Sequence, residues 1–158
     1  MSKKTIALDI DKTLFYTSKT IFDGSIELSN GYYAIYRPWL QELFNYLHSN
    51  QEHFDVVVYS AATWEYIMLL LSLIDDKNII KDVYDRKFCE VLTNNGKESY
   101  YKNAKLLKLE NLYLIDDNEY HFRNYEILGY NCKSFKPTNN EDCEIFEIIN
   151  FLETLKLI

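Results

Sequence analysis

The sequence predicts an α/β protein built as a three-layer sandwich, with a central parallel sheet between two layers of helix. Three short apolar segments, each followed by a polar residue, alternate with segments that have helical periodicity. Short runs with little polar alternation are typical of strands buried on both faces of a parallel sheet. The alternation of such strands with helices favours the α/β class.

The predicted strands of the central sheet are apolar and rich in β-branched residues. They cover residues 5–8, 54–59 and 112–115. Asp9, Ser60 and Asp116 follow them directly. In open α/β sheets, ligands bind outside the carboxyl ends of the strands. These three polar residues therefore mark the expected site.

Helices are predicted at residues 39–47, 64–73, 103–108 and 144–155. Pro38 suits the first turn of the first helix, and Thr63 suits the N-cap of the second. In the last helix, apolar residues recur on one face, as expected of a helix that packs on a core.

Two insertions have the sequence pattern of β-hairpins. Asn30-Gly31 separates residues 26–28 from residues 32–36, and Asn95-Gly96 separates residues 88–92 from Tyr100. The Asn-Gly pair predicts a type I′ turn in both.

The length of 158 residues suits a single domain over residues 1–158. A net charge of −7 disfavours nucleic acid as a partner, because such binding needs a basic face. The three cysteines lack C-x-x-C spacing, so neither a disulfide framework nor a zinc site is expected. With no apolar leader and no run long enough to span a bilayer, we expect an intracellular protein, cytoplasmic or nuclear, without a membrane partner.

Asp9 and Asp11 form a D-x-D pair at the end of the first strand. Two carboxylates in this position can reach one phosphate from different directions. One attacks phosphorus, while the other protonates the leaving oxygen and later activates water. The alternative is a metal-binding or merely solvated acidic turn. The apolar strand before the pair and Thr13-Leu14 after it weigh against that alternative.

Other polar residues would complete such a site. Asp116 and Asp117 offer hard oxygen ligands for Mg²⁺, and several clustered carboxylates are costly without a cation. The Ser60 hydroxyl can donate to a phosphoryl oxygen, and Lys102 can offset negative charge. Taken singly, each has an ordinary alternative: an acidic turn, a loop or N-cap serine, and a surface lysine.

Four segments in this order resemble the motifs of haloacid-dehalogenase (HAD) phosphatases: DIDKTL, VVVYS, YYKNAKLL and LYLIDDN. The finer resemblance is to the CTD-phosphatase-like, NLI-interacting-factor-like branch. It is carried by an arginine-proline helix start at residues 36–43, a second motif at residues 57–66, and an arginine- and cysteine-containing strand at residues 84–89. The resemblance extends from Thr5 to about Leu155.

The resemblance implies a HAD-like Rossmannoid fold and a role for each motif residue. Asp9 would be the nucleophile and Asp11 the general acid/base, with Lys102 stabilising the nucleophile and phosphate. Phosphate and substrate contacts would come from Thr13, Ser60 and Arg86. Magnesium would be held by Asp9, Asp116, Asp117 and the backbone carbonyl of Asp11.

Two departures from the branch concern the substrate. Lys12 stands where the branch usually has an acidic residue, and residues 90–99 lack a histidine-containing pattern often found there. The spacing between motifs leaves no room for a cap domain, so an open site is expected. Its walls would carry hairpin tyrosines, although half-buried strand residues are the ordinary role of most of them. The candidates are Tyr32, Tyr33, Tyr36, Tyr100 and Tyr101.

An open site favours a phosphate displayed on a macromolecule. The first hypothesis is a magnesium-dependent phosphatase of Ser/Thr-phosphorylated proteins or peptides. The second is a phosphatase of nucleotides or nucleic-acid ends. A non-catalytic binding module with the same fold is the third, since fold alone does not fix function.

Overall fold

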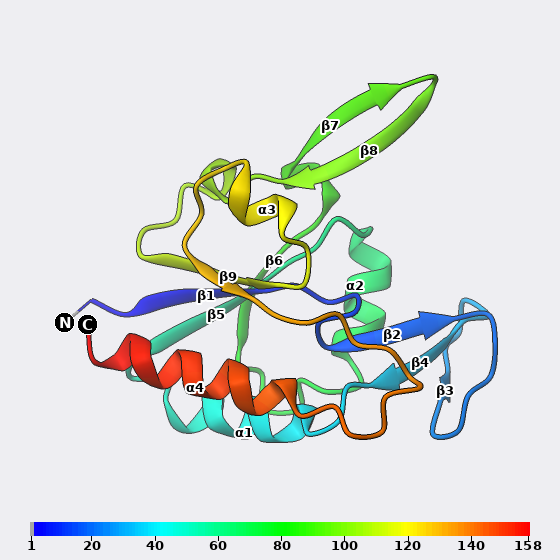
Figure 1. Cartoon of the computed structure of the whole chain (residues 1–158), viewed down its shortest axis with the longest axis horizontal. Coiled ribbons are helices and arrows are strands. Elements are labelled where there is room, and N and C mark those ends of the chain that lie inside the picture. Colours follow the sequence, from blue (N-terminus) through cyan, green and yellow to red (C-terminus); the bar gives the residue numbers. More distant parts are fainter. Residues whose placement is uncertain (1) are drawn as a thin grey trace.

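The computed structural model describes residues 2–158, and its centre is a parallel sheet of five strands in the order β10-β9-β1-β5-β6 (Figure 1). All of the pairings between neighbouring strands are parallel. The strands are β1 (Lys4–Leu8), β5 (Phe54–Tyr59), β6 (Ile80–Tyr84), β9 (Leu112–Asp116) and β10 (Gly129–Asn131). The α/β class and the central parallel sheet predicted from the sequence are confirmed.

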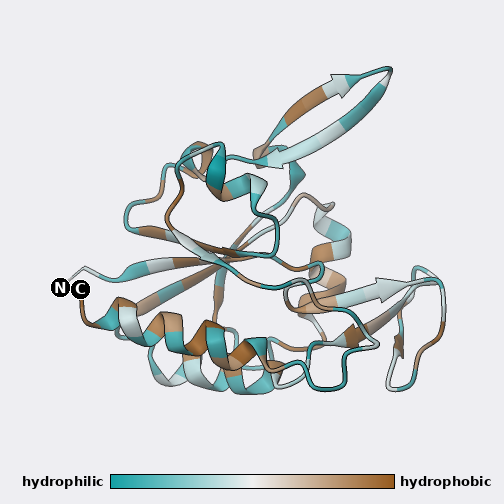
Figure 2. Cartoon of the chain, in the orientation of Figure 1, coloured by the Kyte–Doolittle hydropathy of each residue, from teal (hydrophilic) through white to brown (hydrophobic). Residues whose placement is uncertain are grey.

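Apolar side chains cover both faces of the sheet, and hydrophobic residues are concentrated in its central strands (Figure 2). Successive residues of a strand point to opposite faces. Ile6 and Leu8 accordingly pack into one core cluster, while Ala7 packs into the other. The first cluster is completed by α1 (Leu40–Ser49), α2 (Trp64–Leu71) and α4 (Glu144–Lys156).

The opposite face is covered by shorter elements. They are the 3-10 helix η2 (Ala104–Leu107), the helix α3 (Tyr120–Arg123) and the segments around them. Ala104, Leu107 and Phe122 supply the apolar contacts to this second cluster. Between residues 2 and 158, no helix has the length and apolar character needed to cross a membrane.

The predicted helices are present, with small differences at their ends. The first begins at Leu40 rather than Trp39, because Trp39 has a left-handed backbone with φ 67°. Thr63 is the N-cap of α2, although its side chain forms no capping hydrogen bond. The segment expected at residues 103–108 is the 3-10 helix η2.

Both predicted hairpins form, but only one has the expected turn. Strand β7 (Cys89–Asn94) pairs with β8 (Lys97–Lys102) around Asn95-Gly96. Both of these turn residues have positive φ, as type I′ requires. Strand β3 (Ile26–Glu27) pairs with β4 (Tyr33–Tyr36), but only Gly31 of the Asn30-Gly31 pair has positive φ. The type I′ prediction was therefore wrong for this longer loop.

Further elements lack a clear sequence signal. Strand β2 (Phe15–Ser18) adds to β4, which gives a small sheet in the order β2-β4-β3. Strands β6 and β10 form the two edges of the central sheet. The strand expected at residues 84–89 is interrupted by the 3-10 helix η1 (Arg86–Phe88), which Asp85 caps by accepting from the Lys87 N–H.

Candidate active site

The polar residues that end the central strands meet at one edge of the sheet. Asp9 directly follows β1, Ser60 directly follows β5, and Asp116 is the last residue of β9. The backbone N–H of Asp9 donates to Ile115 at 2.9 Å, and that of Ser60 donates to Tyr84 at 2.9 Å. Because β1 lies between β5 and β9, Asp9 occupies the centre of this edge.

Lys102 joins two of the carboxylates. It is the last residue of β8, and its buried ammonium group contacts Asp9 Oδ1 and lies 2.6 Å from Asp116 Oδ2. The β7–β8 hairpin thus places the positive charge of Lys102 at the sheet edge, although Lys102 is distant from Asp9 in the sequence. Burial opposes the charged form of Lys102, but Asp116 and Asp9 raise the pKa of its ammonium group above its usual range.

The two carboxylates that share Lys102 have different electrostatic environments. Burial and the Asp116 charge raise the pKa of Asp9 well above its usual value, although Lys102 opposes this shift. Asp116 is also buried, but Lys102 and His121 lower its pKa to about 2. Its Oδ1 accepts from the Asn118 N–H at 2.9 Å, and its Oδ2 lies 3.0 Å from His121 Nδ1. Asp116 is therefore the better stabilised anion of the pair.

Three carboxylates form a group that could hold a cation. One oxygen from each of Asp9, Asp116 and Asp117 lies within 4.8 Å of the others. Asp117 is less buried than its neighbour and receives a 2.5 Å hydrogen bond from Ser134 at Oδ2. Hard oxygen donors in this arrangement fit Mg²⁺.

The hydroxyl groups of Thr13 and Ser60 are buried beside this group. Thr13 Oγ1 donates to Asp9 Oδ2 at 2.7 Å and lies 3.4 Å from Asp117 Oδ1. Ser60 Oγ accepts from the Ala62 N–H at 3.1 Å, which leaves its own proton as a donor. Thr13 therefore orients the Asp9 carboxylate in this structure, whereas Ser60 retains a donor for a ligand.

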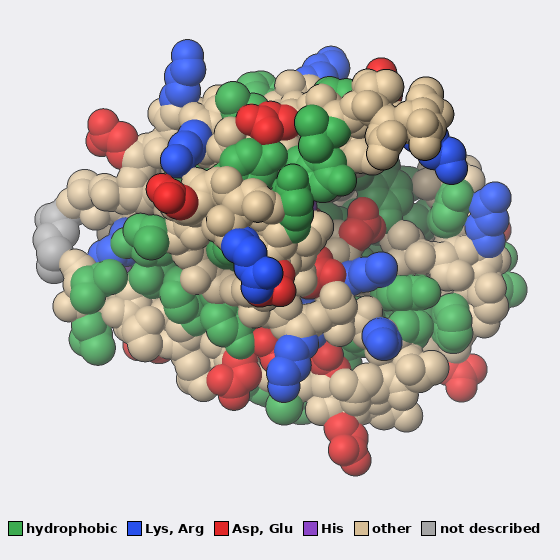
Figure 3. Space-filling model, turned by 45° about the horizontal axis from the view of Figure 1, so that its top comes forward, with side chains coloured by type: hydrophobic (Ala, Val, Ile, Leu, Met, Phe, Trp, Pro, Cys, Tyr) green, Lys and Arg blue, Asp and Glu red, His purple; other side chains and the backbone are tan. Residues whose placement is uncertain are grey.

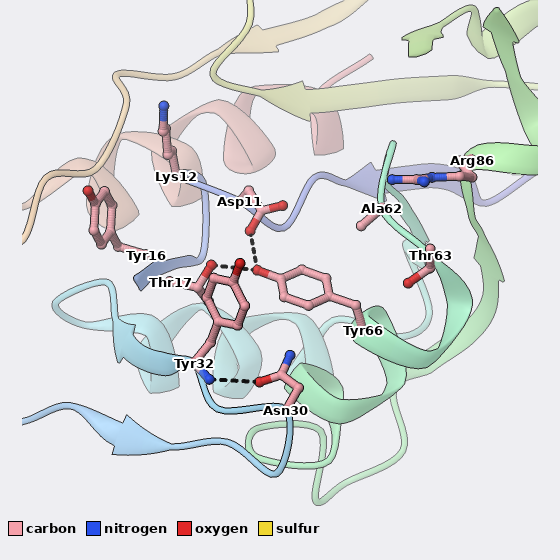
Figure 4. A pocket seen from close by; sticks show the side chains of 10 residues that line it. All are labelled: Asp11, Lys12, Tyr16, Thr17, Asn30, Tyr32, Ala62, Thr63, Tyr66 and Arg86. Carbon is pink, nitrogen blue, oxygen red and sulfur yellow. Dashed lines mark hydrogen bonds between the residues drawn. The ribbon is translucent and has the colours of Figure 1, made fainter. Parts of the chain in front are cut away.

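Asp11 lies apart from the three-carboxylate group. Its Oδ1 accepts a 2.6 Å hydrogen bond from the Tyr66 hydroxyl, and the Tyr66 oxygen lies 2.7 Å from Thr17 Oγ1 (Figure 4). Burial raises the pKa of Asp11, although the Tyr66 hydrogen bond opposes this shift. A raised pKa favours the protonated form that a general acid requires.

Arg37 holds the loop after β1 in place. Its buried guanidinium group forms two hydrogen bonds with Asp142, at 2.9 and 3.0 Å. The same group donates to the backbone carbonyls of Lys12, Thr13 and Lys133. The D-x-D loop is therefore tied to the segment that carries Ser134.

Arg86 lies at the rim of the site. Its Nε donates to the Ala61 carbonyl at 3.1 Å, and its guanidinium carbon lies 4.5 Å from the centre of the Tyr100 ring. These contacts use one N–H and one face of the guanidinium group. The remaining N–H groups stay available to a substrate.

The site opens into a cleft of about 610 Å³, lined by residues that include Asp9, Asp11, Lys102, Asp116 and Asp117. A hollow with acidic side chains inside it and basic ones at its edge is visible in Figure 3. A second pocket of about 540 Å³ shares Asp11 and Arg86 with the cleft and lies over Tyr66 (Figure 4).

The hairpin tyrosines expected at the walls divide into two groups. Tyr100 lines the cleft and Tyr32 lines the second pocket. Tyr36 instead packs against Phe15, and Tyr101 packs against Tyr120. The ordinary packing role therefore holds for part of this group.

The structure brings the predicted site residues to one edge of the sheet, and their catalytic roles remain predictions. The Asp11 carboxylate does not join the acidic group, and the metal contact expected of Asp11 was through its carbonyl. No site role was predicted from the sequence for four residues that orient the site: Tyr66, Ser134, His121 and Arg37. Arg37 and Tyr66 lie in segments that carry the family resemblance, but their contacts were not predicted. The ion pair of Arg37 has no local signature, because its partner Asp142 is 105 positions away.

Comparisons with known proteins agree on one family. Residues 4–158 match the family model of NLI interacting factor-like phosphatases. CTD small phosphatase-like protein 2 of Dictyostelium discoideum is 27% identical over 163 residues, which cover 97% of this chain and 27% of that protein. The chain therefore spans about a quarter of that relative.

Two solved structures share the fold. One is the structure of Fcp1, an essential RNA polymerase II CTD phosphatase. The match covers 98% of this chain and 49% of the Fcp1 chain, with a TM-score of 0.61 and 16% sequence identity. An uncharacterized protein from Listeria monocytogenes serotype 4b matches 98% of this chain and 99% of its own, with a TM-score of 0.64 and 12% identity.

Proposed function

The chain belongs to the NLI interacting factor-like phosphatase family, a family of HAD-type phosphatases, and we propose that it hydrolyses phosphoserine or phosphothreonine esters through a phosphorylated Asp9. The observation that carries this proposal is the contact of Lys102 with both Asp9 and Asp116 at the carboxyl edge of the sheet. A lysine buried between two carboxylates at the ligand-binding edge of an α/β sheet is typical of a functional site.

In the first step, an Asp9 carboxylate oxygen attacks phosphorus and the ester P–O bond breaks. The leaving oxygen takes its proton from Asp11, which becomes a carboxylate. Thr13 fixes the Asp9 carboxylate through its 2.7 Å hydrogen bond. Ser60 and Lys102 offer donors to the phosphoryl oxygens, whose charge needs stabilisation during transfer.

In the second step, Asp11 removes a proton from a water molecule that attacks the phosphorus of phosphorylated Asp9. The acyl-phosphate P–O bond breaks, which releases inorganic phosphate and restores the Asp9 carboxylate. Asp11 thereby regains the proton that it gave away. Asp11 accepts a hydrogen bond from Tyr66 and lies outside the three-carboxylate group, which suits a residue with a separate task.

Magnesium fits the residues at this edge of the sheet. Asp9, Asp117 and the backbone carbonyl of Asp11 would hold it, while Asp116 binds Lys102 and His121. When bound, the ion would neutralise charge on the carboxylates and on the transferring phosphoryl group. The fit rests on Asp9, Asp116 and Asp117, which each place one oxygen within 4.8 Å of the others. One lysine, Lys102, contacts two of them, Asp9 and Asp116.

An extended phosphopeptide is the substrate class that suits the cleft best. The cleft continues past Asp11 and Arg86 into the second pocket. A peptide gains contacts there that a free sugar phosphate cannot make, and remote contacts can assist the chemical step. Nucleotides and nucleic-acid ends are the alternative, which the net charge of −7 disfavours.

The test is kcat/KM, with Mg²⁺ present, for matched phosphopeptides, nucleotides, sugar phosphates and oligonucleotides with 3′- or 5′-phosphate. We expect the phosphopeptides to lead. An advantage of about tenfold or more for oligonucleotide ends, about 1.4 kcal/mol, would replace this substrate class with the alternative. Absence of turnover on every substrate, including aryl phosphates, would favour a binding module.

A further inference from the structure

A third pocket, of about 380 Å³, lies beside the cleft and shares Lys12 and Ser134 with it. Its lining combines two lysines with apolar and aromatic side chains. It is formed by Lys12, Tyr16, Phe22, Ser134, Phe135, Lys136, Pro137 and Thr138. Ser134 also donates to Asp117, so this pocket adjoins the acidic group directly.

The two lysines of this pocket are exposed cations without a partner. Within residues 2–158, the ammonium groups of Lys12 and Lys136 form neither an ion pair nor a hydrogen bond, a property that they share with other exposed lysines such as Lys97 and Lys105. They differ from those lysines because both line one pocket beside the phosphate site, in a chain of net charge −7. They leave local positive charge for a ligand.

The backbone of Lys12 is held in a fixed conformation. Its φ is 63°, in the left-handed region that lysine seldom adopts. Its N–H donates to the Phe15 carbonyl at 2.6 Å, while its own carbonyl accepts from Phe135 at 2.7 Å and from Arg37 at 3.3 Å. Figure 4 shows its side chain pointing away from Tyr66, although Lys12 also lines the pocket over that residue. These backbone contacts therefore fix the position of the Lys12 backbone, from which its charged side chain extends, relative to Asp11.

We propose that Lys12 and Lys136 bind a second anionic group of the substrate, a phosphate or carboxylate on a side chain near the reacting phosphoserine or phosphothreonine. This inference rests on the proposed function. It restricts the preferred substrates to phosphopeptides that carry a second anionic group near the reacting phosphate. Phe22, Phe135 and Pro137 give the pocket apolar walls that suit the carbon atoms of such a side chain. A polynucleotide needs a longer basic track to neutralise successive phosphates.

The test compares matched peptides that carry the reacting phosphate alone or with a second phosphoserine. In the parent enzyme we expect the second phosphate to raise kcat/KM about tenfold at low salt, because it gains two exposed ion pairs that are each weak. With similar contributions from the two lysines, this ratio should fall to about threefold in Lys12→Gln and in Lys136→Gln, and toward one in the double variant. The matched control is Lys97→Gln, at the exposed start of β8 beside the Asn95-Gly96 turn, which should leave the ratio of the two kcat/KM values unchanged.

Binding of the same two peptides to Asp9→Asn protein provides a readout that does not need turnover. We expect a similar ratio of dissociation constants, reduced by salt because exposed charges are screened. Equal binding of both peptides, or an unchanged ratio in both lysine variants, would overturn the inference. So would a lysine-dependent gain that is as large for phosphorylated oligonucleotides. Discrimination in binding without parent turnover would instead refute the proposed function and leave the pocket assignment standing.

Discussion

The Tyr66 hydroxyl lies 2.6 Å from a carboxylate oxygen of Asp11, and the same hydroxyl lies 2.7 Å from Thr17. Tyr66 belongs to α2 and Thr17 to β2, so a helix packed on the central sheet and the small inserted sheet both contribute to this contact. All three residues line the pocket next to the cleft (Figure 4). A substrate that occupies this pocket therefore meets the group that orients Asp11.

Tyr66→Phe is expected to impair protonation of the leaving group. Tyr66 orients Asp11 and stabilises the carboxylate that forms as Asp11 gives up its proton. Hydrogen bonds to charged groups contribute about 1.5–3 kcal/mol, so kcat/KM for an alkyl phosphate should fall about tenfold or more, even though protonated Asp11 becomes more populated. An aryl phosphate with a good leaving group needs little protonation, so its kcat/KM should fall less than about threefold. The measurement is the ratio of the two losses, which a general loss of folded enzyme would not change.

Tyr46→Phe is the matched control for this substitution. Tyr46 donates to Glu153 at 2.6 Å, a tyrosine-carboxylate hydrogen bond of the same length between α1 and α4. Tyr46→Phe should leave kcat/KM unchanged for both the alkyl and the aryl phosphate. Equal losses for alkyl and aryl phosphates in Tyr66→Phe would contradict the assigned role of Tyr66.

Asp9→Asn should remove turnover and leave the fold intact. The amide has nearly the shape of the carboxylate but is a poor nucleophile, so we expect a loss of at least about a thousandfold in kcat. The fold should persist because Lys102 keeps its contact with Asp116. Circular dichroism and thermal unfolding provide the check on structure. Retention of about a tenth of the parent activity would show that Asp9 is not the nucleophile.

Magnesium should stabilise the protein as well as activate it. A ligand at about one hundred times its dissociation constant adds about 2.7 kcal/mol to the free energy of unfolding, so Mg²⁺ should raise the Tm measurably. The rise should disappear in Asp117→Ala and on addition of a chelator. A matched change at Asp76, an acidic residue far from this sheet edge in the turn after α2, should leave the rise intact. Full activity in exhaustively chelated, metal-free protein would exclude this mechanism.

The site could be predicted best where a polar residue directly follows a predicted strand. Asp9, Ser60 and Asp116 could be placed at one edge because short apolar strands define where a parallel sheet ends. Lys102 could be named as a cation for the site, but taken singly it resembles a surface lysine, and only the likeness to known motifs gave it a role beside Asp9. Its position depends on the register of the β7–β8 hairpin, in which it pairs with Cys89.

The contacts that orient these groups could not be predicted from local patterns. Strands β6 and β10 are edge strands with little apolar character, so periodicity gives a weak signal. Ser134 reaches Asp117 across 17 positions of chain. Such pairings depend on how loops pack, and a single sequence does not encode them in any short window.

Arg37 provides the sharpest test of how the loop after β1 is held. Its side chain is fully buried and Asp142 is 7% exposed. Removing one member of a buried ion pair costs about 3–5 kcal/mol, because the other charge remains without a partner. Arg37→Leu should therefore lower the free energy of urea unfolding by about that amount. Lys81→Gln, which breaks an exposed contact with Asp55, should cost less than about 1 kcal/mol.

A substitution by lysine separates the charge of Arg37 from its geometry. Arg37 donates in several directions, to both Asp142 oxygens and to the carbonyls of Lys12, Thr13 and Lys133. A compact ammonium group cannot reproduce this planar fork. Arg37→Lys should therefore remain clearly destabilised, and it should lose activity even at temperatures where it is fully folded, because the carbonyls after Asp11 lose their donors. The double change Arg37→Leu with Asp142→Leu removes both charges, so it should be less destabilised than Arg37→Leu alone. Equal stability of Arg37→Lys and the parent would show that charge alone, and not the fork of hydrogen bonds, holds the loop.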